Sequence, residues 1–119
     1  NKSELEKETE VVLSAEKEKD KLVLRGKDLL YIESADNYAQ VFYLKEAQIQ
    51  NNLLRGSLSR MEEFLNDEDI TRCHRSFIVN LNLVDRVSGN AQGYKLHLRD
   101  VDKLIPVSRK YSHLVERFK

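Results

Sequence analysis

The chain has 119 residues with 20 basic and 20 acidic side chains, so its formal net charge at pH 7 is zero. A neutral chain lacks the uniformly basic surface of many nucleic-acid binders, and this length suits one domain that buries roughly two-thirds of its unfolded surface. The single cysteine, Cys73, has no partner for a disulfide or a metal site, and no apolar run approaches the roughly 20 residues of a membrane-spanning helix. Both observations indicate a reducing cytoplasm.

The charges are unevenly spread along the chain. Residues 1–20 contain seven acids and four lysines, whereas the segment from Lys103 to the end contains five basic residues and one acid. Because the first ten residues alternate acid and base with few apolar anchors, we expect residues 1–20 to be a charged linker or lead-in that partly joins the first strand, followed by one domain over residues 21–119. The start at Asn1 resembles neither a signal peptide nor an initiation site, so we expect a piece of a longer protein.

Short apolar runs bounded by polar residues predict a strand-rich first half. Val11–Leu13 precedes a polar tract at residues 16–20 that can turn the chain. Four further runs have strand character, and residues 34–37 between the second and third of them can stabilise a turn by bonding their own backbone. These four runs are Lys21–Arg25, Leu29–Glu33, Tyr38–Leu44 and Gln48–Leu54.

Helical spacing appears behind Ser57, a candidate N-cap. Apolar residues recur three and four positions apart, which predicts a short helix over about residues 57–65. They are Leu58, Met61, Phe64 and Leu65.

Polar residues and an apolar run stand side by side at residues 70–80. Arg72, His74 and Arg75 fall within four positions, and Phe77–Val79 follows directly. We interpret this stretch as a charged loop that feeds a strand anchored in the core, so that the loop is held in a fixed place. Composition alone favours a plainer interpretation, with solvated charges at both arginines and a structural His74.

The last third of the chain alternates strands and turns before a helical end. A turn at residues 88–93 precedes Tyr94–Leu98, whose strict alternation predicts a half-buried strand. Leu104–Val107 is a last strand in which Pro106 lacks an N–H and should lie on an edge or at a strand end. Helical spacing returns over about residues 109–118. The predicted fold class is mostly β with two short helices, and it lacks the βαβ rhythm of a parallel nucleotide-binding sheet.

The case for catalysis is thin. His74, His97 and His113 show none of the clustering of a zinc site, and no Gly-rich phosphate loop is present. Cys73 and His74 are adjacent, and adjacent residues of an extended chain point to opposite faces, so they do not form a nucleophile and its base. We predict no enzyme activity, metal, cofactor or small-molecule substrate, with Cys73 as a small buried hydrophobe and His97 as a surface residue.

Three separated stretches carry side chains that suit nucleic acid. Asn and Gln pair with adenine, Arg binds guanine through two hydrogen bonds, and Lys, Ser and His suit phosphates. We predict that the three stretches converge on one surface. Simpler roles stay open: a plain hairpin turn with a packed Tyr38, Ser108 as a helix cap and Lys110 as a solvated charge. The stretches are Asp36, Asn37, Tyr38 and Gln40; Arg72, His74 and Arg75; and Ser108, Arg109 and Lys110.

Four motifs occur in order from about residue 21 onward. They are the run Leu29–Tyr38, the pair Ser57-Leu58 with Phe64-Leu65, the string Arg72–Asn80 and the segment Ile105–Arg109. In this order and at these spacings they resemble the LytTR-type DNA-binding domains of bacterial transcription regulators. Four matches in order are far more specific than any single one.

The resemblance implies an elongated, mostly β fold of about ten strands, whose loops rather than a recognition helix enter successive major grooves of double-stranded DNA. Base contacts are implied at Asn37 or Gln40, at Arg75 and at Arg109. Phosphate contacts are implied at Tyr38, Arg72, His74, Ser108 and Lys110. Family members usually follow a receiver domain, as in two-component response regulators, or a membrane segment. We therefore expect an upstream input domain, and two copies of the chain on repeated sites.

Two other functions stay open at the level of sequence. A protein-interaction module would use an exposed sheet edge near Pro106, or the acidic N-terminal segment as a coiled-coil join. A thiol enzyme would need an abnormally acidic Cys73.

Overall fold

The computed structural model describes residues 10–17 and 19–118, and this part of the chain is built mainly from antiparallel strands. Its ten strands form three sheets with the neighbour orders β1-β2, β5-β4-β3-β7-β6 and β10-β9-β8. The mostly β fold class is confirmed, and the predicted helices correspond to α2 and η3. The strands are β1 (Glu10–Ser14), β2 (Lys21–Arg25), β3 (Leu29–Ala35), β4 (Tyr38–Lys45), β5 (Gln48–Arg55), β6 (Ile70–His74), β7 (Phe77–Asn80), β8 (Val84–Asn90), β9 (Gly93–Leu98) and β10 (Leu104–Val107). The helical elements are η1 (Gly26–Asp28), α2 (Leu58–Glu62), η2 (Leu81–Leu83) and η3 (Arg109–Phe118).

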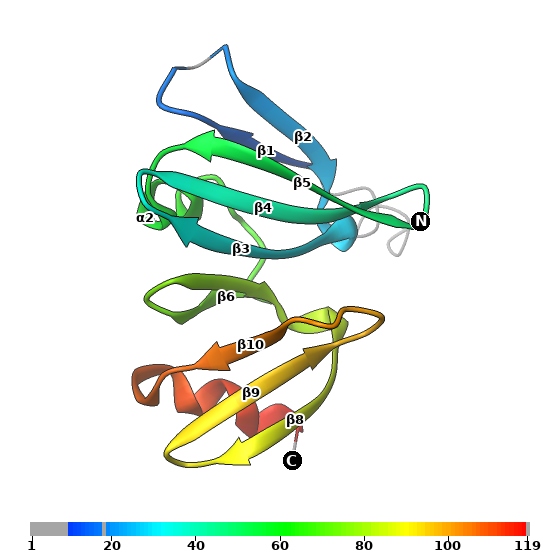
Figure 1. The fold of residues 1–119 in the computed structure, drawn as a ribbon, viewed down its shortest axis with the longest axis vertical. Helices are drawn as coiled ribbons and strands as arrows, with labels where there is room; N and C mark the ends of the chain where they lie inside the picture. Colours follow the sequence, from blue (N-terminus) through cyan, green and yellow to red (C-terminus); the bar gives the residue numbers. More distant parts are fainter. Residues whose placement is uncertain (1–9, 18, 119) are drawn as a thin grey trace.

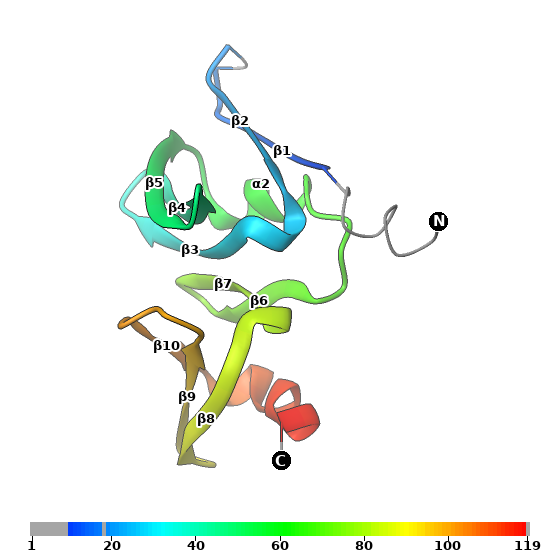
Figure 2. The ribbon, with the colours of Figure 1, turned by 90° about the vertical axis from the view of Figure 1, so that its right-hand side faces the viewer.

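The three sheets are stacked along the longest axis of the molecule (Figure 1). The β1-β2 pair lies at one end, the five-stranded sheet in the middle and the three-stranded sheet at the other end, with η3 beside the last (Figure 2). The extents of 42 × 40 × 24 Å describe a broad slab. None of the helices described is long and apolar enough to cross a membrane. Because the strands run across the slab, turns from different sheets meet along its sides.

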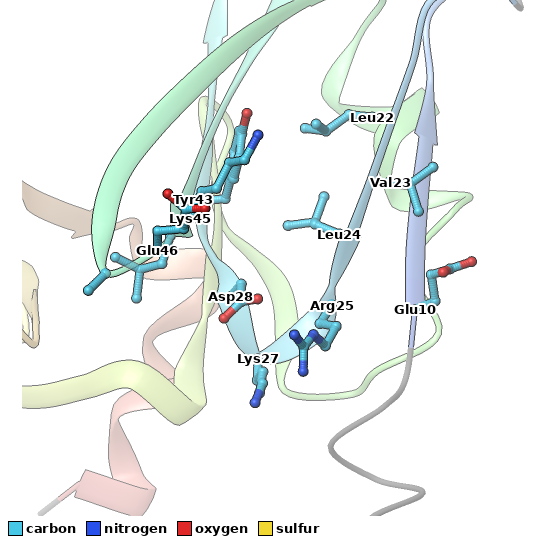
Figure 3. Close-up of a pocket in the computed structure, with 12 residues that line it drawn as sticks. Glu10, Leu22, Val23, Leu24, Arg25, Lys27, Asp28, Tyr43, Lys45 and Glu46 are labelled. Carbon is cyan, nitrogen blue, oxygen red and sulfur yellow. The ribbon is translucent and has the colours of Figure 1, made fainter.

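The β1-β2 pair leans over the β4–β5 turn and leaves an open hollow of about 730 Å³. Leu22 and Leu24 point from β2 into this hollow, toward Tyr43 on β4 (Figure 3). On the other face of β2, Val23 is 56% exposed. The alternation along β2 therefore reflects packing on one face alone.

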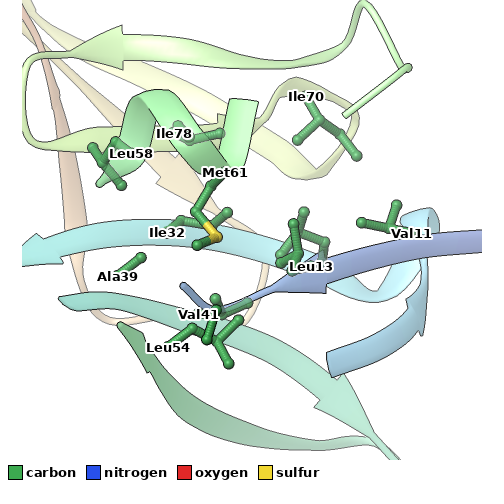
Figure 4. Packing of buried hydrophobic residues seen from close by; sticks show 12 residues of the cluster. Val11, Leu13, Ile32, Ala39, Val41, Leu54, Leu58, Met61, Ile70 and Ile78 are labelled. Carbon is green, nitrogen blue, oxygen red and sulfur yellow. The ribbon is translucent and has the colours of Figure 1, made fainter. Parts of the chain in front are cut away.

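Two clusters of buried side chains form the core, one on each side of β3. In the first, Leu13 of β1 and Met61 of α2 are fully buried, and Met61 points toward Ile32 of β3 (Figure 4). In the second, Tyr31 of β3 joins Leu96 and other side chains of the three-stranded sheet and η3. The register of β3 shifts between Leu29 and Tyr31, and this bulge turns the neighbours Leu30 and Tyr31 to the second cluster while Leu29 and Ile32 face the first, so β3 supplies both clusters.

Strand β1 belongs to the packed part of the molecule. It pairs with β2 from Glu10 to Ser14, and Val11 and Leu13 are only 5% and 0% exposed. The stretch of the predicted lead-in that joins the first strand is thus part of the first cluster. Of the rest of that lead-in, residues 1–9 and 18 lie outside the described residues.

The predicted loop at residues 70–76 is wrong. Ile70–His74 forms β6, and only Arg75 and Ser76 turn the chain into β7. Ile70 and Cys73 are the buried residues of β6, three positions apart, where a regular strand buries every second residue. The register shifts between Arg72 and His74, and such a bulge conceals a strand from a search for alternation.

Two other strands run further than predicted. β3 continues to Ala35, which leaves Asp36 and Asn37 as a two-residue turn, with Asp36 at a φ of 56° that Asp tolerates. β8 continues to Asn90, which is halfway through the predicted turn at residues 88–93. Gly89 within it has a φ of 89°, and a Cβ at this position would lie 2.2 Å from the carbonyl oxygen of Gly93, so the strand requires glycine there.

Two local predictions are confirmed. Ser57 caps α2, since its hydroxyl oxygen accepts a hydrogen bond from the backbone N–H of Arg60 at 3.1 Å. Pro106 lies in β10, which is an edge strand of the three-stranded sheet.

Leu13→Ala should lower the free energy of unfolding by about 2–5 kcal/mol, because it empties a fully buried position of the first cluster. Val12→Ala is the matched control: Val12 is 37% exposed on the other face of β1, and its loss should cost less than about 1 kcal/mol. Urea unfolding followed by circular dichroism measures both. Equal losses would contradict the packing of β1 into the first cluster.

Candidate nucleic-acid interface

Three turns from distant parts of the chain lie along one side of the slab, at the left in Figure 1. They are the β3–β4 turn at residues 36–37, the β6–β7 turn at 75–76 and the β10–η3 junction at 108–110. Two backbone hydrogen bonds hold them to neighbouring strands: Ser76 O of the second turn accepts from Ser34 N near the end of β3 at 2.9 Å, and Ser108 N of the third donates to Cys73 O on β6 at 3.0 Å. We call this side, formed by residues 36–37, 75–76 and 108–110, the turn edge.

The first turn presents exposed side chains. Asn37 is exposed, and its carbonyl oxygen accepts a hydrogen bond from Gly56 N at 2.9 Å, which ties the turn to the entrance of α2. Tyr38 is 40% exposed rather than packed, and the Arg55 guanidinium carbon lies 5.6 Å from its ring centroid. Sequence reasoning missed Arg55, because only the pairing of β4 with β5 brings it opposite Tyr38.

Gln40 does not belong to the turn. It lies within β4, where it pairs with Glu33 on one side and Leu53 on the other. Its side-chain amide donates to Asn51 Oδ1 on β5 at 3.2 Å. Of the two candidates predicted for the first stretch, Asn37 therefore lies on the turn edge and Gln40 lies along the sheet.

The two arginines of the second stretch point in different directions. Arg72 is half-buried, and its guanidinium donates to His74 O and Arg75 O, both at 3.1 Å, and to Glu62 Oε1. Arg75 is exposed at the tip of the turn. The structure thus separates an inward arginine from an outward one, which a sequence cannot do for two charges three positions apart.

His74 is half-buried between the turn and β7. Its Nδ1 accepts a hydrogen bond from Ser76 N at 3.1 Å, and its ring meets Phe77 edge-on with centroids 5.8 Å apart. Burial, and then the charges of Arg75 and Lys95, lower the pKa of the imidazole. A neutral ring with Nδ1 as acceptor carries its proton on Nε2, so Nε2 is free to donate.

A hollow of about 670 Å³ joins the second and third stretches. Sequence reasoning missed two of its lining residues, Ser59 and Tyr111. The helical spacing of apolar residues in η3 assigns Tyr111 to the core, and no motif or pattern in α2 marks Ser59 as a site residue. The hollow is lined by Ser59, Arg72, His74, Arg75, Ser108, Lys110 and Tyr111.

The third stretch begins η3. The Ser108 carbonyl oxygen accepts from Tyr111 N at 2.9 Å, so the backbone of Ser108 starts the helical segment. Arg109 and Lys110 are exposed in its first turn, and Lys110 Nζ lies 5.5 Å from the centroid of the Tyr111 ring. Both cations thus reach solvent beside the second stretch.

Charge is distributed unequally between the two sides of the slab. On the turn edge, Arg75, Arg109 and Lys110 form no ion pair within the residues that the structure describes, whereas the nearby Arg55 and Arg72 are paired with Glu16 and Glu62. The edge contains these three cations and one exposed acid, Asp36, so a chain with zero net charge still presents a basic strip, which attracts a polyanion. The turns on the opposite side mix both signs: Lys27, Asp28, Glu46, Arg99, Asp100, Asp102 and Lys103.

Cys73 has the properties of a structural residue. It is fully buried, as predicted, and burial raises the pKa of its thiol to about 12, which is the reverse of an activated nucleophile.

His97 is half-buried rather than on the surface, with its Nε2 at 2.8 Å from Ser88 Oγ. No group of three or more potential metal ligands occurs among residues 10–17 and 19–118.

Comparison with known proteins agrees with this geometry. Residues 19–119 match the family described as the LytTr DNA-binding domain. The chain belongs to the LytTR family. It is 31% identical over 106 residues to an uncharacterized response regulatory protein of Vibrio cholerae, a match that covers 88% of this chain and 40% of that relative. The chain therefore spans about two-fifths of the length of this relative.

The fold is also that of a solved LytTr DNA-binding domain from Bacillus cereus. The TM-score is 0.69 at 22% sequence identity, over 93% of this chain and 96% of the other. The predicted family and fold are thereby confirmed, and the chain is a LytTR DNA-binding domain.

In the free domain, the pKa of the His74 ring should lie below the usual value of about 6.5, because burial penalises the charged form, and because protonation places a charge beside Arg75 and breaks the bond from Ser76 N. The unfolded chain then binds the proton more readily, so the contribution of His74 to stability is present above about pH 6.5 and is lost as the pH falls toward its folded pKa. A nuclear magnetic resonance titration of the ring carbons measures it. Arg75→Ala should move the pKa back toward the usual value, and a folded pKa above that value would contradict this environment.

Proposed function

We propose that this domain binds double-stranded DNA at specific sequences, and that it is the output domain of a bacterial transcription regulator in the cytoplasm. The observation that carries this proposal is the turn edge, where three turns, two of them held to neighbouring strands by backbone hydrogen bonds, present exposed polar and basic side chains. Phosphate attraction and base reading both need such side chains on one rigid surface. We assign the domain no enzymatic role.

The turn edge is a continuous strip on one side of the molecule. Its three turns follow one another along the longest axis (Figure 1), and the hydrogen bonds from Ser34 N to Ser76 O and from Ser108 N to Cys73 O hold neighbouring parts of it together. Such a strip can present side chains from each turn to the base edges of a major groove. Helix α2 is a poor candidate for the groove, because it has five residues and buries Leu58 and Met61.

We assign base contacts to Asn37, Arg75 and Arg109. An exposed amide pairs with adenine in the major groove, and an exposed guanidinium binds guanine O6 and N7. Gln40 is the weaker choice in the first stretch because its amide already donates to Asn51. We assign phosphate contacts to four side chains that are exposed or line the hollow, with Nε2 of His74 as a hydrogen-bond donor. These are Tyr38, His74, Ser108 and Lys110.

We further propose that the domain acts in a longer protein. The Vibrio cholerae relative is a response regulatory protein of which this chain matches 40%, so a receiver domain upstream of residue 1 fits the remaining length. A receiver would alter the occupancy of DNA by this domain, for example by bringing two copies onto repeated sites, and the turn edge lies free for DNA in each copy.

Arg75→Ala and Arg109→Ala should each weaken binding to the cognate duplex by about 1–3 kcal/mol, because each removes a two-pronged contact to a base, while binding to scrambled duplex stays nearly unchanged. Lys110→Ala is the matched control on the same edge. It should weaken binding to every sequence and reduce the salt slope by about one ion, as a phosphate contact does. The cognate duplex is first selected from a random pool at fixed salt, and affinities are then measured by fluorescence anisotropy.

Two outcomes would overturn these assignments. If both arginine variants discriminate cognate from scrambled duplex as the parent does, the base contacts lie elsewhere. If the parent shows no sequence preference and its affinity barely changes between low and moderate salt, an apolar protein partner at an open edge such as β10 replaces DNA as the ligand.

A duplex with two cognate half-sites spaced by about 10–10.5 base pairs should bind two copies of the domain, because that spacing repeats the groove on one face of the helix. A duplex with one half-site should bind one copy and serves as the control. Sedimentation of each complex measures the stoichiometry. One copy on both duplexes would remove the proposal of paired binding.

A further inference from the structure

We propose that Arg72 and Glu62 are a positioning pair, which fixes the shape of the β6–β7 turn and thereby aims Arg75 at DNA. This inference rests on the proposed function. From the sequence we expected Arg72 to contact a phosphate; here Arg72 instead holds the turn that carries Arg75. The inference also assigns a role to Glu62, which the sequence did not single out.

The first observation is where the donors of Arg72 point. Nε donates to His74 O at 3.1 Å and Nη2 donates to Arg75 O at 3.1 Å, so one guanidinium spans two successive carbonyl groups of the turn. Nη1 donates to Glu62 Oε1. The side chain of Arg72 is only 21% exposed. A planar guanidinium with its donors in fixed directions can make these three contacts together, whereas an ammonium group cannot.

The second observation is that both backbone groups of Ser76 are also held. Besides the two carbonyls held by Arg72, Ser76 O accepts from Ser34 N at 2.9 Å, and Ser76 N donates to His74 Nδ1 at 3.1 Å. With these groups directed into the protein, the side chain of Arg75 is the part of the turn that reaches solvent. The direction of Arg75 thus depends on contacts that Arg75 itself does not make.

The third observation is that Glu62 stands on a rigid support. α2 is capped by Ser57 and held by Leu58 and Met61, which are 3% and 0% exposed in the first cluster. A carboxylate on this helix fixes the far end of the Arg72 guanidinium. The pair therefore connects the first cluster to the turn edge through two side chains.

Arg72→Lys tests the proposal because it keeps the charge and removes the planar fork. We expect cognate affinity to fall roughly tenfold, the size of losing hydrogen bonds to a charged group, with scrambled duplex bound within about twofold of the parent. In duplexes selected from a random pool, the preference at the base pair read by Arg75 should broaden. If Arg72 instead contacted a phosphate, lysine would take over that contact, and the affinities for cognate and scrambled duplex would both change little.

Glu62→Gln is the milder second variant, and Glu63→Gln is its matched control, with the same change one residue away at the exposed C-cap of α2. Each removes one negative charge near DNA, so both should strengthen binding to scrambled duplex alike. Only Glu62→Gln should lower the ratio of cognate to scrambled affinity, by about threefold, as the loss of a partly exposed pair would. Equal ratios for the two variants would overturn the role of Glu62.

A double-mutant cycle separates positioning from direct contact. In an Arg75→Ala background, Arg72→Lys should have almost no further effect on the cognate duplex, because the side chain that it aims is absent. Additive losses would overturn the inference. Urea unfolding of every variant confirms that each is folded at the temperature of the binding assay. If the parent and Arg72→Lys discriminate cognate from scrambled duplex equally well, this inference alone is wrong. If the parent itself shows no sequence preference, the proposed function is wrong.

Discussion

The β6–β7 hairpin is the element on which the rest of the structure depends, because it contacts both clusters and two of the three turns. Ile70 and Ile78 are buried in the first cluster, while Cys73 and Phe77 are buried in the second. Its backbone accepts hydrogen bonds from Ser34 and Ser108, and β7 pairs with β3 in the middle sheet. The hairpin thus places the third stretch beside the first, although about 70 residues of sequence separate them. The buried Cys73 thiol contributes packing volume at this crossing point.

Electrostatics explains how a neutral chain can suit a polyanion. Folding sorts the charges, since Glu16 and Glu62 near the turn edge are paired with Arg55 and Arg72, while Arg75, Arg109 and Lys110 have no ion-pair partner among the described residues and outnumber the one acid of the edge, Asp36. Paired charges largely cancel at a distance, so unpaired ones set the local field. Net charge therefore predicts little about this domain, and the position of each charge predicts much more.

The sequence allowed the family, the fold class, both helical segments and the convergence of three stretches to be predicted, because apolar spacing and motif order depend on local sequence. It failed where tertiary pairing decides. The bulge between Arg72 and His74 hid β6, and the pairing of β4 with β5 occupied the amide of Gln40 and brought Arg55 to Tyr38. Nor could sequence separate inward Arg72 from outward Arg75, since that difference depends on Glu62 and on two carbonyl groups of the folded turn.

Strand β3 has a consequence for how the molecule comes apart. Leu30 and Tyr31 pack on one side of it and Leu29 and Ile32 on the other, so loosening this strand exposes apolar surface to water in both clusters at once. We therefore expect heat or denaturant to unfold both clusters in one cooperative transition and not in two successive ones. A strand shared in this way lets one small domain of three sheets behave as a single cooperative unit.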